Sequence, residues 1–173
     1  CKSAAQQKLM EKILSIQSAV TFGFVGNNVA APVITHLGHQ PLLLNTVTLA
    51  VHPGYGLIAG GPMPNSTFDA ILGALPSLGN LKNIGTIITG YLGAFAQVNT
   101  ISQFIETWQL DQRLGSYILD PVLGDNGRIY VDKKLVTALH DDLLPLANFV
   151  TPNQFELELL SGQTVRDVPS ADE

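Results

Sequence analysis

Short apolar runs alternate along the chain with longer segments in which apolar side chains recur at helical spacing. The runs are rich in Ile, Leu, Val and Thr, and they predict strands at residues 13–18, 40–49, 84–89, 117–120 and 149–151. The segments with helical spacing predict helices at residues 26–37, 66–78, 97–114, 132–146 and 153–161. Because this alternation is typical of a parallel sheet covered on both faces, we expect a doubly wound α/β domain.

Local signals add detail to three of these segments. Pro32 lies inside the first predicted helix, which it either begins or kinks. Residues 52–65 are rich in Gly and Pro, which favours a loop. Ser66 and Asp69 have the spacing of a capping box, so we expect the second helix to begin there.

Composition excludes several classes of protein. Hydrophobic residues make up 46% of the chain and charged residues 13%, which argues against disorder, yet no apolar run reaches the length of a membrane helix. The net charge of −5 disfavours non-specific binding to nucleic acid, and the single cysteine permits no internal disulfide. Residues 1–12 are polar and lack the features of a signal peptide, so we expect them to be disordered or introduced by cloning. Residues 13–173 are then one domain of a cytoplasmic protein.

Polar side chains gather where the predicted strands end. Functional groups of parallel sheets lie beyond the carboxyl ends of the strands, where neighbouring strand ends meet. The candidates in this sequence are Ser18 and residues 46–55, 90–91, 120–125 and 151–156. We expect them to converge on one edge of the sheet.

Asp120 and Asp125 flank a short turn after the fourth predicted strand. Two carboxylates one loop apart could organise Mg²⁺, usually through waters, around the phosphates of a nucleotide. Alternatively, Asp120 caps nearby backbone N–H groups and Asp125 forms a local turn. The spacing leaves both interpretations open.

Thr151, Asn153 and Glu156 surround the start of the last predicted helix. Asn153 and Glu156 have the spacing of a capping box, and Gly162 would end the helix. Glu156 could also hold Mg²⁺ through water, with Thr151 and Asn153 hydrogen-bonding to phosphate. The two interpretations are compatible.

Four further residues near strand ends have two interpretations each. Ser18 either hydrogen-bonds to a ligand or caps a turn, and Tyr91 either stacks on an aromatic ring or is buried with a satisfied hydroxyl. His52 and Tyr55 either line a pocket or lie at the surface. The other histidines lack the spacing of metal ligands, and we expect them at the surface: His36, His39 and His140.

Three common motifs are absent. The chain has no G-x-x-x-x-G-K-[ST], no G-x-G-x-x-G after the first strand and no G-x-S-x-G. These absences disfavour a P-loop nucleotide-binding protein, a dinucleotide-binding protein and a hydrolase with a nucleophile elbow.

Seven strings of residues together resemble one family of enzymes. They are ILSIQS, GFVGNN, LLLNTVT, HPGYG, TGYLG, DPVLGDNGRIYV and LLPLANFVTPNQFELELLSG. Over residues 13–162 the chain is similar to the pyridoxal kinases of the ribokinase-like superfamily. Hydroxymethylpyrimidine kinases share DPV and TPN, but SIQS and NQFE favour the pyridoxal kinases.

The resemblance implies a fold and an activity. The fold would be a ribokinase-like, doubly wound, mostly parallel sheet with helices on both faces, incomplete at its C-terminal side. The activity would be ATP-dependent phosphorylation of the 5′-hydroxymethyl group of pyridoxal, pyridoxine or pyridoxamine, by a homodimer that uses Mg²⁺ and has room for a monovalent cation such as K⁺. The alternatives are a hydroxymethylpyrimidine kinase and a non-catalytic protein that binds vitamin B6.

The resemblance also implies a role for particular residues. Substrate would contact Ser18, His52 and Tyr91. The nucleotide would lie near Asp120, Asp125, Tyr130, Thr151 and Asn153. The metal would be held by Asp120 and Glu156.

The sequence departs from the family pattern at three points. Pro53 stands where the family commonly has a threonine, and Ala19 stands where a histidine is frequent, which leaves substrate preference open. The glycine-rich GTGD segment, whose aspartate would be the catalytic base, does not occur before Glu173. We therefore expect the chain to be part of a longer kinase and to be inactive alone.

Overall fold

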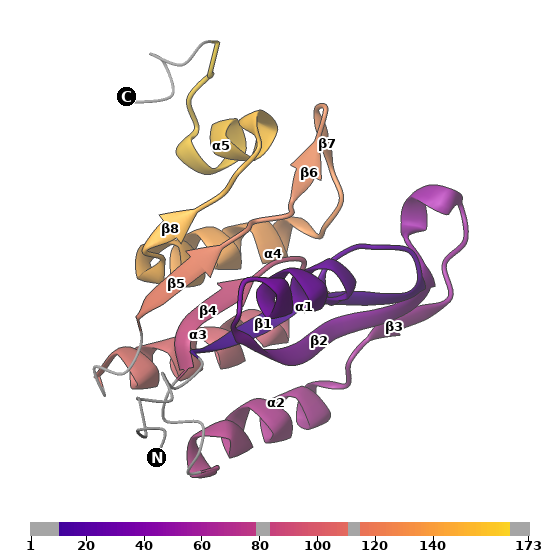
Figure 1. The fold of residues 1–173 in the computed structure, drawn as a ribbon. Helices are drawn as coiled ribbons and strands as arrows, with labels where there is room; N and C mark the ends of the chain where they lie inside the picture. The colour runs from indigo at the N-terminus through magenta and orange to yellow at the C-terminus, as the bar shows by residue number, and fades with distance from the viewer. Residues whose placement is uncertain (1–10, 79–83, 111–114, 167–173) are drawn as a thin grey trace, which may run out of the picture.

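A six-stranded, mostly parallel sheet forms the centre of the computed structural model, which describes residues 11–78, 84–110 and 115–166 (Figure 1). The strand order is β3-β2-β1-β4-β5-β8, and β3 alone among these strands runs antiparallel to its neighbour. The strands are β1 (Lys12–Phe22), β2 (Gln40–Val51), β3 (Gly60–Pro62), β4 (Ile84–Thr89), β5 (Ser116–Leu119) and β8 (Phe149–Val150). All five predicted strands are present, and residues 1–10 of the predicted N-terminal segment lie outside the described residues.

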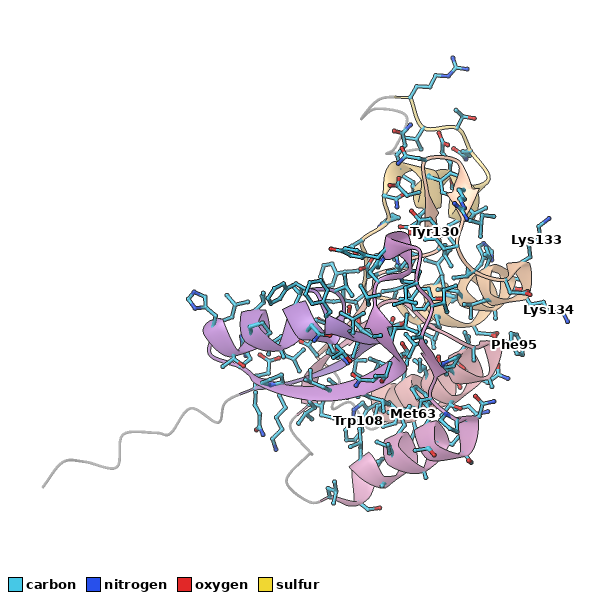
Figure 2. The ribbon with its side chains drawn as sticks, turned by 90° about the vertical axis from the view of Figure 1, so that its right-hand side faces the viewer. Met63, Phe95, Trp108, Tyr130, Lys133 and Lys134 are labelled. Carbon is cyan, nitrogen blue, oxygen red and sulfur yellow. The ribbon has the colours of Figure 1, made fainter. Side chains whose placement is uncertain are left out.

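Helices cover both faces of the sheet, as predicted. Figure 1 shows α1 in front of β1 and β2, whereas α3 and α4 lie behind the sheet; Figure 2 gives the side view. The helices are α1 (Asn27–His36), α2 (Asn65–Ala74), α3 (Phe95–Leu110), α4 (Lys133–Ala138) and α5 (Gln154–Ser161). A π-helical turn (Leu139–Leu143) and a 3₁₀ turn (Leu144–Leu146) continue α4. None of the described helices is long and apolar enough to cross a membrane.

The main apolar core lies between the sheet and the helices behind it. Phe68 of α2, Ile101 of α3 and Ile87 of β4 are all fully buried in this core. Burying side chains of this size contributes roughly 1.5–3 kcal/mol each. Tyr117 of β5 is also fully buried, and its hydroxyl lies 2.8 Å from Oγ1 of Thr89. Burial raises the pKa of the Tyr117 phenol, so the group stays neutral.

Two predicted boundaries were wrong because tertiary pairing extends the strands. The first strand was predicted to end at Ser18, but β1 continues to Phe22 by pairing with β2 alone. Residues 52–65 were predicted as loop, but they contain a 3₁₀ turn (Pro53–Tyr55) and β3, which pairs antiparallel with β2. Proline is tolerated in β3 because an edge strand leaves one side of its backbone unpaired.

One predicted helix signal was wrong, and one of the two interpretations of Pro32 is excluded. The capping box of Ser66 and Asp69 does not form, because α2 begins at Asn65 with Pro64 as its N-cap. The Asp69 carboxylate instead accepts a 2.6 Å hydrogen bond from Thr100 Oγ1 on α3. Pro32 lies in the middle of α1 and does not begin it. Residues 111–114 of the third predicted helix lie outside the described residues.

A buried asparagine joins β1, α1 and β2. The Asn27 side chain is 3% exposed, and its Oδ1 accepts a 2.8 Å hydrogen bond from Ser15 Oγ. Its Nδ2 donates to Gln17 O and to Leu44 O at 3.3 and 3.2 Å. Nδ2 also lies 2.7 Å from Asn45 Oδ1. The network therefore fixes the start of α1 against both strands.

We expect Asn27→Ala to lower the free energy of unfolding by about 2–4 kcal/mol, because it leaves buried polar groups without partners. The measurement is urea unfolding of wild-type and variant protein. Thr35→Ala, which removes an exposed hydroxyl bonded within α1, is the control and should change stability by less than about 0.5 kcal/mol. Equal effects of the two substitutions would contradict the role of the network.

Candidate functional site

Backbone hydrogen bonds join the residues that follow β4, β5 and β8 to the neighbouring strands. Gly90 N, after β4, donates to Ile16 O of β1 at 3.1 Å. Asp120 N, after β5, donates to Thr89 O at 2.9 Å, and Thr151 N, after β8, donates to Leu119 O at 3.0 Å. The residues that follow β4, β5 and β8 therefore lie at one edge of the sheet, as predicted. The order of strands reverses beside this edge, between β1 and β4, where open α/β sheets bind ligands.

Asp120 and Glu156 form a pair of carboxylates at this edge. Asp120 is half-buried, and burial raises the pKa of its carboxyl group above the ordinary value. The negative charge of Glu156 raises this pKa further, while a hydrogen bond from the Thr151 side chain opposes the shift. The edge thus brings together three of the predicted site residues and concentrates negative charge there.

The capping box predicted at the last helix is confirmed. Asn153 Oδ1 accepts a 2.9 Å hydrogen bond from Glu156 N, and Glu156 Oε2 accepts a 3.0 Å bond from Asn153 N. Glu156 is 3% exposed, and its Oε1 also accepts from Leu123 N at 2.8 Å. Asn153 Nδ2 donates to Gly124 O at 2.8 Å. The start of α5 therefore holds the turn that follows Asp120.

The donor set of this edge fits Mg²⁺. In the described parts of the chain, no group of three or more His, Cys, Asp or Glu side chains is arranged to hold a metal ion. Mg²⁺ is usually bound by one or two carboxylates, with water and substrate phosphates as its other ligands. Asp120 is the accessible carboxylate of the pair, and a cation would relieve its repulsion from Glu156.

Asp125 lies apart from this pair, in a hairpin that the sequence analysis missed. The hairpin consists of β6 (Gly124–Asp125) and β7 (Arg128–Ile129). The Asp125 carboxylate is exposed and accepts hydrogen bonds from Asn126 N and Nδ2 at 2.8 and 3.0 Å. Asn126 and Gly127 both have positive φ, as a tight hairpin turn requires. The Asn-Gly pair in the sequence could have predicted this turn. A local turn contact, one of the two interpretations considered for Asp125, is thus present.

Tyr91 and Tyr130 line the same cavity of about 350 Å³. Phe95 at the start of α3 and Lys134 in α4 lie on its other sides, and Figure 2 labels these two residues with Tyr130. The aromatic rings offer stacking surfaces, and the lysine offers a positive charge for an anionic group. The structure therefore brings together a predicted substrate residue and a predicted nucleotide residue.

Ser18 and His52 are not among the residues that line this cavity. Ser18 is half-buried at an irregularity in β1, where pairing with β2 shifts between Gln17 and Ala19. His52 is exposed, and its Nδ1 accepts a 3.1 Å hydrogen bond from Gly54 N. His52 thereby caps the 3₁₀ turn that Pro53 begins, and its substrate role stays a prediction.

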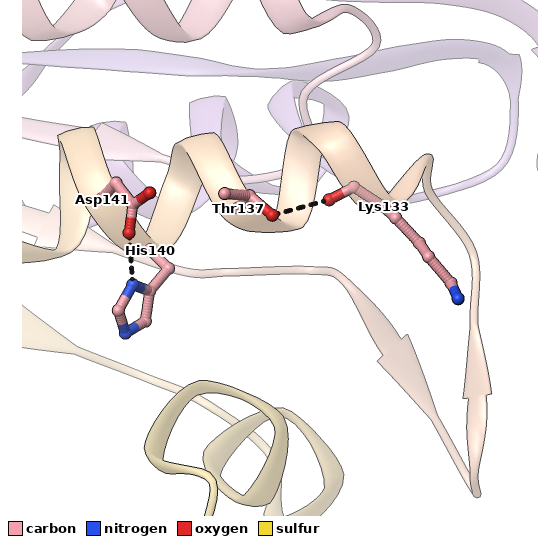
Figure 3. Close-up of polar contacts among 4 residues, drawn as sticks. All are labelled: Lys133, Thr137, His140 and Asp141. Atoms are coloured by element: carbon pink, nitrogen blue, oxygen red, sulfur yellow. Dashed lines mark hydrogen bonds and ion pairs between the residues drawn. The ribbon is translucent and has the colours of Figure 1, made fainter.

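The contacts along α4 and the turn after it are local (Figure 3). Thr137 Oγ1 donates to Lys133 O at 3.2 Å, and His140 Nδ1 lies 2.7 Å from Asp141 Oδ1. His140 and His36 are exposed, as predicted, whereas His39 is half-buried beside Glu11. These histidines therefore belong to the surface and to the opposite end of the sheet, not to the site.

Two buried polar residues near the site were given no individual role by the sequence analysis, although Thr46 begins the candidate range 46–55. Thr46 of β2 and Gln97 of α3 contact the loop that carries Tyr91. One signal in the sequence could have identified Gln97. It is a polar residue next to Val98, on the apolar side of an amphipathic helix.

Comparison with known proteins gives consistent matches. The sequence profile of the phosphomethylpyrimidine kinase family matches residues 73–173. A pyridoxine/pyridoxal/pyridoxamine kinase of Bordetella avium is 37% identical over 169 residues, which are 97% of this chain and 57% of that protein. The chain thus spans little more than half the length of this relative.

Solved structures of pyridoxal kinases share the fold. The pyridoxal kinase of Leishmania donovani in complex with ADP and pyridoxamine has a TM-score of 0.86 and 34% identity, over 94% of this chain and 56% of that one. The pyridoxal kinase of Entamoeba histolytica has a TM-score of 0.88 and 29% identity, over 94% and 58%. The predicted ribokinase-like fold and the resemblance to pyridoxal kinases are confirmed.

We expect Asp120→Asn to raise the midpoint of thermal unfolding by a few degrees at pH 7. The raised pKa means that the folded protein favours the protonated carboxyl, so this stabilising effect is complete below the ordinary Asp pKa and is lost as pH rises through the folded pKa. The uncharged amide avoids that loss, so the difference between variant and wild type should shrink as pH falls toward the ordinary Asp pKa.

Thermal unfolding from about pH 3 to about pH 8 measures this difference. Asp69→Asn, at an exposed aspartate of α2, is the control and should show no such gain at pH 7. An Asp120→Asn protein that is less stable than wild type at pH 7 would contradict the predicted repulsion.

Proposed function

Because the chain belongs to the phosphomethylpyrimidine kinase family, we propose that the protein transfers a phosphoryl group from ATP to the 5′-hydroxymethyl group of pyridoxal, pyridoxine or pyridoxamine. The observation that carries the proposal is the polar edge of the sheet, where Asp120, Thr151 and Glu156 adjoin the ends of β5 and β8. A homologous fold from Leishmania donovani, solved with ADP and pyridoxamine, supports a site for both a nucleotide and a vitamer.

The vitamer would lie near Ser18, His52 and Tyr91. Tyr91 lines a cavity, and an aromatic residue there suits a pyridine ring. Glycine at position 26 supports close packing beside Ser18, because a Cβ there would lie 2.2 Å from Ser18 O. Pro53 has no N–H to donate, so His52 and the backbone of this turn would supply the polar contacts to the vitamer.

The nucleotide would lie on the side of β5, β8 and the hairpin. Thr151 and Asn153 are exposed polar residues at the start of α5, and we assign them, with Asp125 and Tyr130, to the ATP phosphates. Mg²⁺, when bound with ATP, neutralises charge on the phosphates. Asp120 would hold it directly and Glu156 through water, since both Glu156 oxygens already accept backbone hydrogen bonds. K⁺, the homodimer and the cytoplasmic location stay predictions.

A second candidate is phosphorylation of a hydroxymethylpyrimidine, which the name of the matching family profile favours. A competition assay with pyridoxal and hydroxymethylpyrimidine would separate the two activities. We expect pyridoxal to be the better substrate of the intact protein, by kcat/KM. Preference for the pyrimidine would reject the first proposal, and Pro53→Thr would then test whether this proline sets the preference.

We expect Asp120→Ala and Glu156→Ala each to lower kcat with MgATP and pyridoxal by about 100-fold or more, because each removes a carboxylate that would hold Mg²⁺ at the phosphates. The assay is steady-state phosphorylation of pyridoxal by the intact protein, with Mg²⁺ varied. Asp69→Ala removes an exposed carboxylate of α2 and is the matched control, expected to keep wild-type turnover.

Normal turnover in both site variants would reject the metal assignment. Binding of pyridoxal by wild-type protein without any turnover of ATP would instead favour the non-catalytic vitamin B6-binding alternative.

A further inference from the structure

The loop of residues 90–94, which carries Tyr91, is held from behind by two buried polar side chains. Thr46 comes from the middle of β2 and is 0% exposed, and Gln97 comes from the first turn of α3 and is 1% exposed. Neither side chain lines the cavity that Tyr91 faces. Their contacts are therefore with the loop itself.

Two hydrogen bonds join these residues to the loop, and a third joins the two residues to each other. Thr46 Oγ1 donates to Tyr91 O at 2.6 Å. Gly93 N donates to Gln97 Oε1 at 3.0 Å, and Gln97 Nε2 donates to Thr46 O at 2.8 Å. The bonds form a closed ring in which the loop contributes one carbonyl and one N–H. Because both side chains are buried, water cannot replace these bonds at little cost.

Packing contacts and a backbone hydrogen bond also hold the loop in place. A Cβ on Gly93 would lie 2.2 Å from Val47 Cγ1, so the loop backbone touches the side chain of β2. Leu92, the residue between, is 2% exposed in the apolar core. Gly90 N is bonded to Ile16 O, which fixes the beginning of the loop. The backbone of Tyr91 is thus fixed on both sides, and Tyr91 as a whole is half-buried and lines the cavity.

We propose that Thr46 and Gln97 are positioning residues for the vitamer site, which set the place of the Tyr91 ring through its backbone. The proposal rests on the proposed kinase function, because Tyr91 is assigned there to the vitamer. Displacing a group that binds the vitamer by a fraction of an ångström weakens binding of the vitamer and leaves binding of ATP unaffected. None of the three hydrogen bonds in this ring involves a residue assigned to the nucleotide.

The test is Thr46→Val, which keeps the shape of the side chain and removes its hydroxyl. We expect KM for pyridoxal to rise about 5- to 10-fold, as loss of one buried hydrogen bond allows, while KM for ATP changes less than about 2-fold. Thr46→Ser restores the hydroxyl and should restore KM for pyridoxal. Gln97→Met, which removes the other two bonds at similar volume, should act in the same direction.

The matched control is Thr100→Val on the same helix. Thr100 Oγ1 donates to Asp69 Oδ1 on α2, away from the loop. This variant loses a hydrogen bond between elements of the fold, so it should lower stability without changing KM for pyridoxal. It separates a general loss of stability from displacement of Tyr91.

A double-mutant cycle with Tyr91→Ala identifies the route of the effect. The Tyr91→Ala protein keeps the carbonyl to which Thr46 bonds but lacks the aromatic ring. Because Thr46 acts by placing that ring, Thr46→Val should raise KM for pyridoxal by less than about 2-fold further in the Tyr91→Ala protein. A full 5- to 10-fold further rise would overturn the proposal, as would equal rises in both KM values. Wild-type protein that does not phosphorylate pyridoxal would reject the proposed function, and this inference with it. Active wild-type protein with an unchanged Thr46→Val would reject the inference alone.

Discussion

Parallel pairing of β4, β5 and β8 places the end of each strand beside the end of the next, and β4 ends beside Ile16 of β1. The backbone bonds of Gly90, Asp120 and Thr151 extend this pairing by one residue beyond the regular strands. Each of those residues begins a loop that carries candidate chemistry, so the positions of the loops follow from the register of the sheet. A shift of one residue in any strand would turn its side chains to the opposite face and move its loop away from the others.

The site places like charges together, which costs stability. Burial raises the energy of the ionised Asp120 carboxyl group, and the charge of Glu156 raises it further. Backbone N–H groups compensate part of this cost at Glu156, because Leu123 and Asn153 donate to its two oxygens. A kinase that binds a divalent cation with ATP would gain from the remaining unbalanced charge at Asp120. The same residues therefore serve the capping of α5 and the proposed binding of Mg²⁺.

Buried polar groups in this domain join elements that are far apart in the sequence. Asn27 connects α1 with β1 and β2, and Gln97 connects α3 with β2. Apolar contacts alone would hold these elements together but would tolerate small displacements. Directional bonds to backbone atoms fix the loops beside Ser18 and Tyr91. The polar residues behind the site thus contribute to its geometry without touching a ligand.

The sequence by itself determined the order of the elements and the residues at the strand ends. Features that depend on neighbours close in the chain could be predicted. They are the apolar runs of β4 and β5, the capping box of Asn153 and Glu156, and the kinase strings. Only the tertiary structure decided where β1 ends, that Gly60–Pro62 is a strand, and that Asp69 bonds to Thr100 instead of capping α2. It also decided that Thr46 and Gln97 hold the loop of Tyr91. The reason is the same in each case: these features depend on partners distant in the sequence, and pairing with β2 or contact between α2 and α3 outweighs the weak local preference.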